Sequence, residues 1–407
     1  MSTPLTTAYR RYALALFLAV NLLNYIDRQV LYAVFPLVKE SLQISDTSLG
    51  LLGSAFMVVY MCTAPIFGWI GDRGNKVRLA AGGLGVWSLA TMLAGVTTGY
   101  SQLLGARSLV GIGEASFGTV APGIIADYFP QERRGKILSW FYLAIPVGSA
   151  LGYLLGGVIG QRFGWQTAFL LVGAPGLLLI LPMALLKTVK FPRKEARTAT
   201  SYSSLLKNRS FVLNTLAMTA MTFALGGMAQ WIPTFLHRIH GLSVARGNLL
   251  FGGLTVAAGI IGTLLGGWLG DHYQKKRPDG YLLVSGWGFI IGIPATLLAL
   301  SSSDLSTALT GMFLAELCLF LNTGPLNTVI VNVTRHDMRA MAFAVNIFVI
   351  HALGDAISPA FIGFLSDHFG LGNALLSTVA AIMLAAVFCL LCARTVADDL
   401  VVDTPAR

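Results

Sequence analysis

Charged residues are scarce in this chain. Lys, Arg, Asp and Glu make up 11% of its 407 residues, whereas a soluble domain has roughly a quarter. Hydrophobic residues make up 55%. This balance excludes an ordinary soluble domain, because too few polar side chains are present to face water. The composition therefore predicts a protein that lies in a lipid bilayer.

The patterns that signal enzymes and metal sites are also lacking. The sequence has no metal-ligand spacing, no Walker loop and no plausible Ser-His-Asp order. Cysteine is rare, and all four residues lie in apolar runs: Cys62, Cys318, Cys389 and Cys392. Such positions favour free thiols over disulfides. We expect no enzymatic activity, no cofactor and no bound metal.

Long apolar runs are what the chain has instead. A transmembrane helix needs about 20 apolar residues, and about twelve runs meet this length. They lie near 11–37, 47–71, 77–99, 101–127, 136–162, 166–189, 209–238, 246–271, 280–301, 304–333, 339–368 and 371–394. We therefore predict an all-α membrane protein with twelve transmembrane helices.

The positions of the basic residues predict its orientation. The net charge is +10, and most of the 28 lysines and arginines lie in loops on one side of the predicted membrane. Few lie on the other side: Lys39, Arg162, Arg238 and Arg246. Cytoplasmic loops carry an excess of Lys and Arg. We expect both termini in the cytoplasm, and we interpret the positive charge as a topology signal, not as a nucleic-acid surface.

One segment occurs twice, about half the chain length apart. GWIGDRGNKVR at 68–78 reappears as GWLGDHYQKKR at 267–277. Repeats at this spacing indicate two similar halves, and in a membrane protein such halves suggest rocking about a site between them. The polar, basic segment at 190–208 separates six predicted spans from six. The predicted domains are an amino-terminal bundle at 1–189, a cytoplasmic linker at 190–208 and a carboxyl-terminal bundle at 209–407.

Twelve spans with this motif in both halves resemble the major facilitator superfamily over essentially the whole chain. The resemblance implies two pseudo-symmetric six-helix bundles that work by alternating access. It also implies a cytoplasmic latch that holds the outward-open state. Its residues here are Asp72, Arg73, Arg78, Arg134 and Asp271. The alternative is that the basic residues only set the topology, and the two roles are compatible.

Three further segments are similar to the Spinster family, particularly its bacterial homologues. They are NYIDR at 24–28, RSLVGIGEAS at 107–116 and FYLAIPVGS at 141–149. The resemblance implies transport of sphingolipid or lysophospholipid type, with coupling at the acids of spans one and four. The short termini favour a bacterial inner-membrane protein over an animal one. Pro146-Val147-Gly148 departs from the Gly-Pro order of drug antiporters, which leaves the direction of coupling open.

Asp27, Arg28, Arg107 and Glu114 lie inside predicted spans. Each charge costs about 2.5–3.5 kcal/mol at mid-bilayer, so such residues point to function. The helical rise places all four in a slab about 10 Å thick. Our hypothesis is that Asp27 and Glu114 exchange protons while Arg28 and Arg107 compete as their partners, because a buried carboxylate that loses its cation takes up a proton. The alternative is a permanent salt-bridge network between the two spans.

The second half has fewer charges inside its spans. Glu316, His351 and Asp355 are secondary polar candidates, with His351 one turn before Asp355. For each of them, a proton site and a polar residue satisfied within the bundle are both open. No acid in span seven matches Asp27, so we expect coupling to be asymmetric between the halves.

Aromatic and methionine side chains supply candidates for a substrate cavity: Phe56, Met57, Tyr60, Phe141, Tyr142, Tyr153, Met218, Phe223 and Trp231. Such walls suit the tail of an amphipathic or lipid-like anion, with Arg28 or Arg107 for its head. Each aromatic can equally be core or lipid-facing surface. The alternatives are a proton-linked carrier of small organic acids or drugs, and a transporter-like receptor without flux. We expect a monomer that interacts with protons, its substrate and membrane lipid.

Overall fold

The computed structural model describes residues 6–129, 131–188, 202–335 and 338–401. Every regular element in these ranges is a helix. Within them, twelve helical segments are long and apolar enough to cross a membrane. The predicted fold class and the twelve predicted spans are therefore confirmed.

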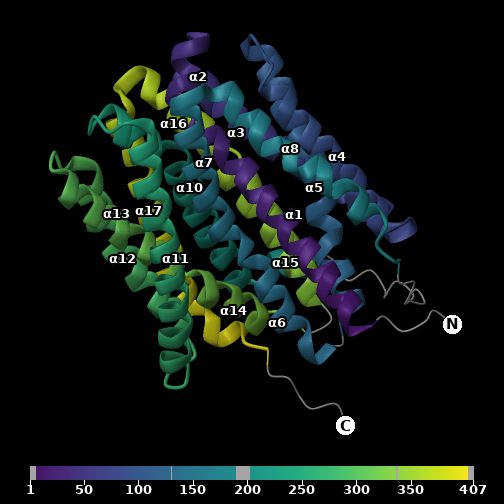
Figure 1. The fold of residues 1–407 in the computed structure, drawn as a ribbon. Helices are drawn as coiled ribbons and strands as arrows, with labels where there is room; N and C mark the ends of the chain where they lie inside the picture. The colour runs from purple at the N-terminus through teal and green to yellow at the C-terminus, as the bar shows by residue number, and fades with distance from the viewer. Residues whose placement is uncertain (1–5, 130, 189–201, 336–337, 402–407) are drawn as a thin grey trace. The chain divides into compact units, whose positions relative to one another are not determined.

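The first half of the chain forms α1 (Thr7–Ala33), α2 (Phe35–Leu42), α3 (Asp46–Arg73), α4 (Lys76–Ala94), α5 (Tyr100–Tyr128), α6 (Gln131–Tyr142), α7 (Ala144–Phe163) and α8 (Trp165–Ala184). The second half forms α9 (Tyr202–Lys207), α10 (Arg209–Arg238), α11 (Val244–Gln274), α12 (Gly280–Ser301), α13 (Leu305–Phe320), α14 (Thr323–Val333), α15 (Arg339–Ile350), the π-helix η2 (His351–Asp355), α16 (Ser358–Phe369) and α17 (Leu371–Asp399). Figure 1 shows their course.

Some predicted spans consist of more than one helix. The fifth divides into α6 and α7, the tenth into α13 and α14, and the eleventh contains η2. Proline has no N–H and clashes with the carbonyl four residues before it, and each of these irregularities lies about one turn before a proline: Pro146, Pro325 and Pro359. Other prolines, such as Pro65 and Pro122, lie inside continuous helices.

The chain divides into two compact units. Unit 1 comprises Met1–Lys194 and Ile232–Gly253, and unit 2 comprises Glu195–Trp231 and Leu254–Arg407. The end of α10 and the start of α11 therefore group with unit 1. Most of the predicted linker at 190–208 lies outside the described residues, and α9 forms within the rest of it. The predicted domain boundaries stay a prediction.

In unit 1, α1 packs against α7, and α5 packs against α3 and α4 (Figure 1). Small residues allow these close contacts. A Cβ atom at Gly152 of α7 would lie 2.6 Å from the Ile26 carbonyl oxygen of α1, and one at Gly113 of α5 would lie 2.5 Å from the Trp87 amide nitrogen of α4. Glycine therefore brings α4 and α5 close together at the level of Glu114.

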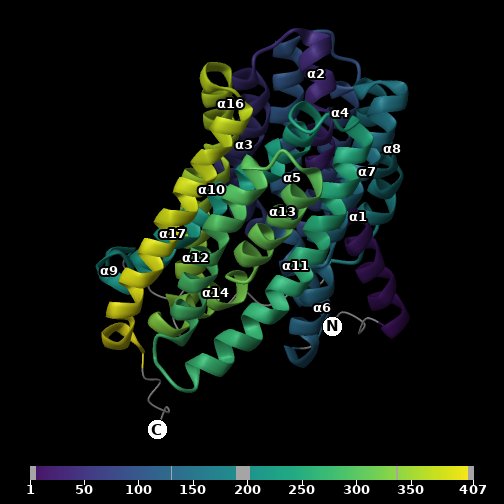
Figure 2. The same ribbon diagram turned by 90° about the vertical axis from the view of Figure 1, so that its left-hand side faces the viewer.

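In unit 2, α12 packs against α13 and α17, which Figure 2 shows after a quarter turn about the vertical axis. Glycine again sets a close approach, because a Cβ atom at Gly262 of α11 would lie 2.6 Å from the Leu317 carbonyl oxygen of α13. Asp355 of η2 lies against Gly226 of α10. These contacts position the acids of unit 2.

Candidate functional site

The four charged residues predicted at mid-membrane come together in unit 1 as two crossed ion pairs. Arg28 Nε of α1 donates to Glu114 Oε2 of α5 at 2.6 Å. Arg107 Nη1 of α5 donates to Asp27 Oδ1 of α1 at 3.2 Å. Each helix thus contributes one carboxylate and one guanidinium group. Asp27 and Arg28 are neighbours on α1, and Arg107 and Glu114 lie about two turns apart on α5.

A third helix contributes to this network. The Thr91 hydroxyl of α4 donates to Asp27 Oδ2, and Thr91 is fully buried. Sequence reasoning missed Thr91. The signal for Thr91 in the sequence is weak, because a single hydroxyl in an apolar span can also form its hydrogen bond to a backbone carbonyl of its own helix. Only the packing of α4 on α5 shows which acid it serves.

The members of the network differ in exposure. The exposed fractions are 2% for Asp27 and 0% for Arg107 and Glu114, whereas the Arg28 side chain is 18% exposed. Within the described part of the chain, Arg107 Nε, Arg107 Nη2 and Glu114 Oε1 have no hydrogen-bond partner. In the described structure, the network therefore contains hydrogen-bond donors and an acceptor that are not used, and Arg28 is its more accessible cation.

Aromatic rings surround the two guanidinium groups. The Phe56 ring of α3 lies 5.2 Å from Arg28 Cζ and 5.4 Å from Arg107 Cζ. Tyr25 and Tyr60 each place a ring 5.1 Å from Arg28 Cζ. Cations are attracted to ring faces within about 6 Å. Phe56 and Tyr60, predicted for the cavity, thus lie at the charged network, and the neighbouring Tyr25, which the prediction omitted, lies there as well.

Three other cavity candidates of unit 1 lie near this region of the core. Phe141 is 3% exposed and belongs to the apolar core together with Phe56, and half-buried Met57 packs against that core. Tyr142 is 48% exposed, and its ring lies 5.4 Å from the Phe141 ring. Of these three, Tyr142 alone presents a largely open surface.

Of the remaining candidates, Phe223 is half-buried and the others are buried. Tyr153 is 1% exposed and packs edge-on against Phe251 at 5.3 Å. In unit 2, Trp231 is 0% exposed, and its Nε1 donates to the Pro359 carbonyl at 3.1 Å. Met218 is also buried, and Phe223 packs on another ring of unit 2. The assignment of these residues to a cavity stays a prediction.

The predicted latch residues of the first motif make local contacts. The Arg73 guanidinium stacks on the Trp69 ring, with Cζ 4.2 Å from its centroid, and donates to the Trp69 carbonyl at 3.4 Å. Asp72 and Arg78 are exposed. Among the described residues, neither of them forms an ion pair.

The other two latch residues are also bonded locally. Arg134 Nε donates to the Phe129 carbonyl at 3.1 Å, in the turn that precedes α6. Asp271 Oδ1 accepts a hydrogen bond from the Tyr281 hydroxyl at 2.7 Å. Three of the five latch candidates, Arg73, Arg134 and Asp271, therefore bond to nearby residues, and the other two are exposed. Their shared role stays a prediction.

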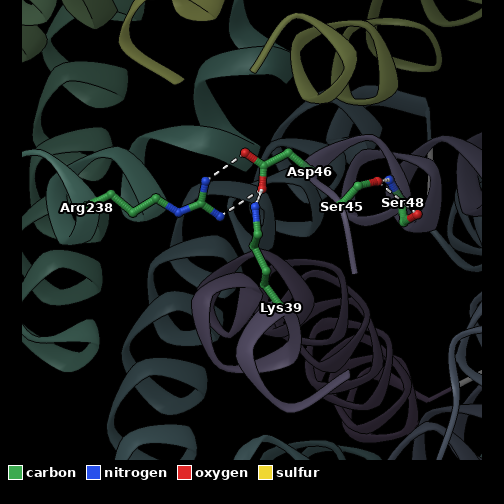
Figure 3. A network of polar contacts seen from close by, with 5 residues as sticks. All are labelled: Lys39, Ser45, Asp46, Ser48 and Arg238. Carbon is green, nitrogen blue, oxygen red and sulfur yellow. Dashed lines mark hydrogen bonds and ion pairs between the residues drawn. The ribbon is translucent and has the colours of Figure 1, made fainter. Parts of the chain in front are cut away.

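A second charged cluster, absent from the sequence analysis, gathers around Asp46 in unit 1 (Figure 3). Arg238 donates to both Asp46 carboxylate oxygens, at 2.7 and 2.9 Å. Lys39 Nζ donates to Asp46 Oδ1 at 2.6 Å. We call Lys39, Asp46 and Arg238 the Asp46 cluster.

Helix geometry favours the Asp46 cluster. Asp46 begins α3 and Arg238 ends α10, which are the helix ends that stabilise a negative and a positive charge, respectively. Asp46 is 2% exposed. The cluster borders a hollow of about 350 Å³ lined by Pro36, Lys39, Glu40, Gln43, Ile44, His237 and Arg238. The Asp46 cluster was not predicted from the sequence. Lys39 and Arg238 were interpreted there only as charges on the membrane side opposite the basic loops.

In unit 2 the secondary polar candidates form separate contacts. Glu316 Oε1 of α13 accepts a hydrogen bond from the Thr255 hydroxyl of α11 at 3.1 Å. His351 Nδ1 lies 2.9 and 3.0 Å from the two Asp355 oxygens on η2. The His351 and Asp355 side chains are 34% and 18% exposed. Neither contact contains an arginine.

Comparisons with known proteins agree with this architecture. Residues 17–359 match the model of the Major Facilitator Superfamily. The chain is 38% identical to protein spinster homolog 1 of Xenopus laevis over 382 residues, which cover 87% of this chain and 72% of that protein. It is 35% identical to human protein spinster homolog 1 over 379 residues, which cover 86% of this chain and 71% of that one.

Two solved structures share the fold. One is a bacterial homologue of the human lysosomal transporter Spinster, in an inward-facing and unoccupied conformation. It has a TM-score of 0.89 and 25% identity, and the match covers 98% of this chain and 100% of that one. The other is a D-xylose–proton symporter, with a TM-score of 0.74, 15% identity and coverage of 94% and 97%.

Proposed function

The chain belongs to the Spinster family of the major facilitator superfamily, and we propose that it couples proton movement to the transport of an amphipathic or lipid-like anion by alternating access. Members of this family are multi-pass membrane transporters and not enzymes. The observation that supports proton coupling is the pair of crossed contacts, Arg28–Glu114 and Arg107–Asp27.

The crossed pairs suit a coupling role because each joins α1 to α5. When these helices shift, a carboxylate that separates from its arginine is left in a dry interior, where it takes up a proton. Glu114 Oε1 and two Arg107 nitrogens, which have no hydrogen-bond partner among the described residues, are available for a change of partner. In a permanent salt-bridge network, we would expect every buried polar atom to be hydrogen-bonded, because unsatisfied buried polar atoms destabilise a fold.

Arg28 suits the recognition of an anionic head group. It is the most exposed member of the network, and charge-assisted bonds to carboxylate or phosphate are among the strongest in proteins. An anion bound at Arg28 would compete with Glu114 and free that carboxylate to accept a proton. Phe56 and Tyr60, whose rings lie beside the guanidinium, would contact the apolar part of the substrate.

The wider assignments are part of the same proposal. We place both termini in the cytoplasm and the protein in a bacterial inner membrane as a monomer. The latch residues Asp72, Arg73, Arg78, Arg134 and Asp271 would engage one another in another state of the cycle, because here each of them is exposed or bonded locally. Membrane lipid surrounds the apolar helix faces.

The test is flux of a labelled lysophospholipid in proteoliposomes under an imposed pH gradient. We expect gradient-driven flux in the native chain and its loss in Asp27→Asn and in Glu114→Gln. Glu40→Gln is a matched control, because Glu40 is an exposed acid outside the network. Equal gradient dependence in both network variants and the native protein would exclude this coupling site.

The same proteoliposomes distinguish the alternatives. A carrier of small organic acids or drugs would show gradient-driven uptake of a labelled organic acid and none of the lipid. A transporter-like receptor would bind the lipid without any turnover in the native protein. Either result contradicts the proposed lipid transport, and the second also contradicts transport as such.

A further inference from the structure

Unit 2 contains a buried acid that the proposed mechanism does not use. Glu316 lies on α13 and is 3% exposed. Its Oε1 accepts one hydrogen bond, from the Thr255 hydroxyl at 3.1 Å. Its other oxygen, Oε2, is buried and has no hydrogen-bond partner among the described residues.

In the part of the chain that the structure describes, no cation faces this carboxyl group. α13 contains no Lys, Arg or His, and neither does α12, which packs against it. α11 has ionisable groups only toward its ends. Arg246 lies about 13 Å along the helix from Thr255, and the group at Asp271, His272 and Tyr273 lies about 24 Å away or more. Glu316 forms no ion pair within the described part of the chain.

The chemical state of Glu316 follows from these surroundings. A charged carboxylate in a dry interior loses its hydration, and no arginine among the described residues compensates for that loss here. A neutral carboxyl group leaves only one O–H unsatisfied, which is a much smaller penalty. We propose that Glu316, with Thr255 as its positioning residue, is a second proton-binding site, located in unit 2 and separate from the crossed pairs of unit 1.

A proton fits this site better than a metal ion does. Hard cations in proteins take about six or more oxygen ligands, or keep part of their hydration shell. The described residues supply one carboxyl group and one hydroxyl here, and they contain no group of three or more His, Cys, Asp or Glu that would hold a metal. A proton needs a single oxygen. In this site the proton binds Oε2 and leaves it to water, with no other bond made or broken.

Infrared difference spectroscopy tests the site without any transport substrate. The full chain in lipid nanodiscs is compared with Glu316→Gln. At neutral pH, we expect the difference spectrum to contain the C=O band of a neutral carboxyl group. On raising the pH, this band should be replaced reversibly by carboxylate bands. Glu40→Gln is the control, and its exposed acid should give carboxylate bands already at neutral pH.

Every other outcome of this experiment contradicts the proposal. Carboxylate bands for Glu316 at neutral pH would show a charged group. A neutral band that persists at every pH would show a structural acid that exchanges no proton. Loss of the neutral band on adding sodium ions at constant pH would show a metal-ion site.

Two more variants separate this site from the rest of the protein. Thr255→Val preserves shape but removes the hydroxyl, so the Glu316 C=O band should move to higher frequency as its hydrogen bond is lost. An unmoved band would exclude the positioning role. Glu114→Gln should leave the Glu316 band in place, and its loss would show that the two sites are not independent. Failure of gradient-driven flux would contradict only the proposed function, because the infrared measurement needs no transport.

Discussion

In unit 1 each acid buried in the membrane lies against an arginine, whereas in unit 2 Glu316 lies against a threonine hydroxyl. Asp27 and Glu114 have cation partners at 3.2 and 2.6 Å, and Glu316 has a neutral donor at 3.1 Å. Duplicated architecture therefore does not imply duplicated electrostatics. Unit 1 thus accommodates its buried acids by pairing them with arginines, whereas unit 2 accommodates Glu316 with no counter-charge among the described residues.

The His351–Asp355 pair is intermediate between these two arrangements. Its imidazole and carboxylate lie 2.9 Å apart, and both side chains are partly exposed. The pair lies on η2, and π-helical turns often occur at functional sites. The asymmetry expected from the sequence, with coupling concentrated in the first half, stays a prediction that the following experiments sharpen.

The largest effect should come from breaking the most buried pair. Arg107→Met leaves the Asp27 carboxylate without its cation in a dry interior, so the free energy of unfolding should fall by about 3–5 kcal/mol. Thermal unfolding in detergent measures this loss. Adding Asp27→Asn to the same chain should restore more than half of it. A loss below about 1 kcal/mol would mean that the pair contributes no more than a surface contact.

A second contrast lies within the network itself. Arg28→Gln removes the exposed cation, so binding of a lysophospholipid should weaken about 10- to 100-fold, the range that a lost charge-assisted hydrogen bond gives. Arg107→Gln should weaken binding less, because Arg107 is 0% exposed. Equilibrium binding to the purified protein measures both. Equal losses in the two variants would contradict the assignment of the head group to Arg28.

The Asp46 cluster should be weaker than the Arg107 pair. Arg238→Gln leaves Asp46 bonded to Lys39, and the cations of this cluster are partly exposed, at 25% and 35%. We expect the free energy of unfolding to fall by about 1–2 kcal/mol. Arg246→Gln, an exposed arginine of the same region, serves as the control and should have little effect. A larger loss than in Arg107→Met would reverse this ranking.

The smallest effect should come from Glu316→Gln. If Glu316 is neutral, glutamine replaces it with a group of the same shape and charge, and the free energy of unfolding should change by less than about 1 kcal/mol. Glu114→Gln should cost more, about 1.5–3 kcal/mol, because it removes a bond to a charged partner. Thermal unfolding of the two variants under identical conditions decides the matter. Similar losses would erase the proposed difference between the units.

The twelve spans and the all-α class were predictable because both depend on the length and hydropathy of continuous segments. The four charges of unit 1 were identifiable for the same reason, since a charge inside an apolar run is visible in the sequence. The interruptions were not predicted. Pro146, Pro325 and Pro359 each accompany a break, yet Pro65 and Pro122 lie in continuous helices. The presence of a proline therefore does not by itself determine where a helix is interrupted.

The sequence by itself determined which ionisable side chains lie inside the spans: two acids and two arginines in the first half, and Glu316, His351 and Asp355 in the second. Only the tertiary structure decided their partners. Arg28 bonds to Glu114 across 86 residues, Thr91 serves Asp27 across 64, and Arg238 reaches Asp46 across 192. Hydropathy depends on neighbours along the chain, whereas an ion pair depends on which helix faces pack against each other. Close contacts at glycines and the positions of helix ends determine that packing.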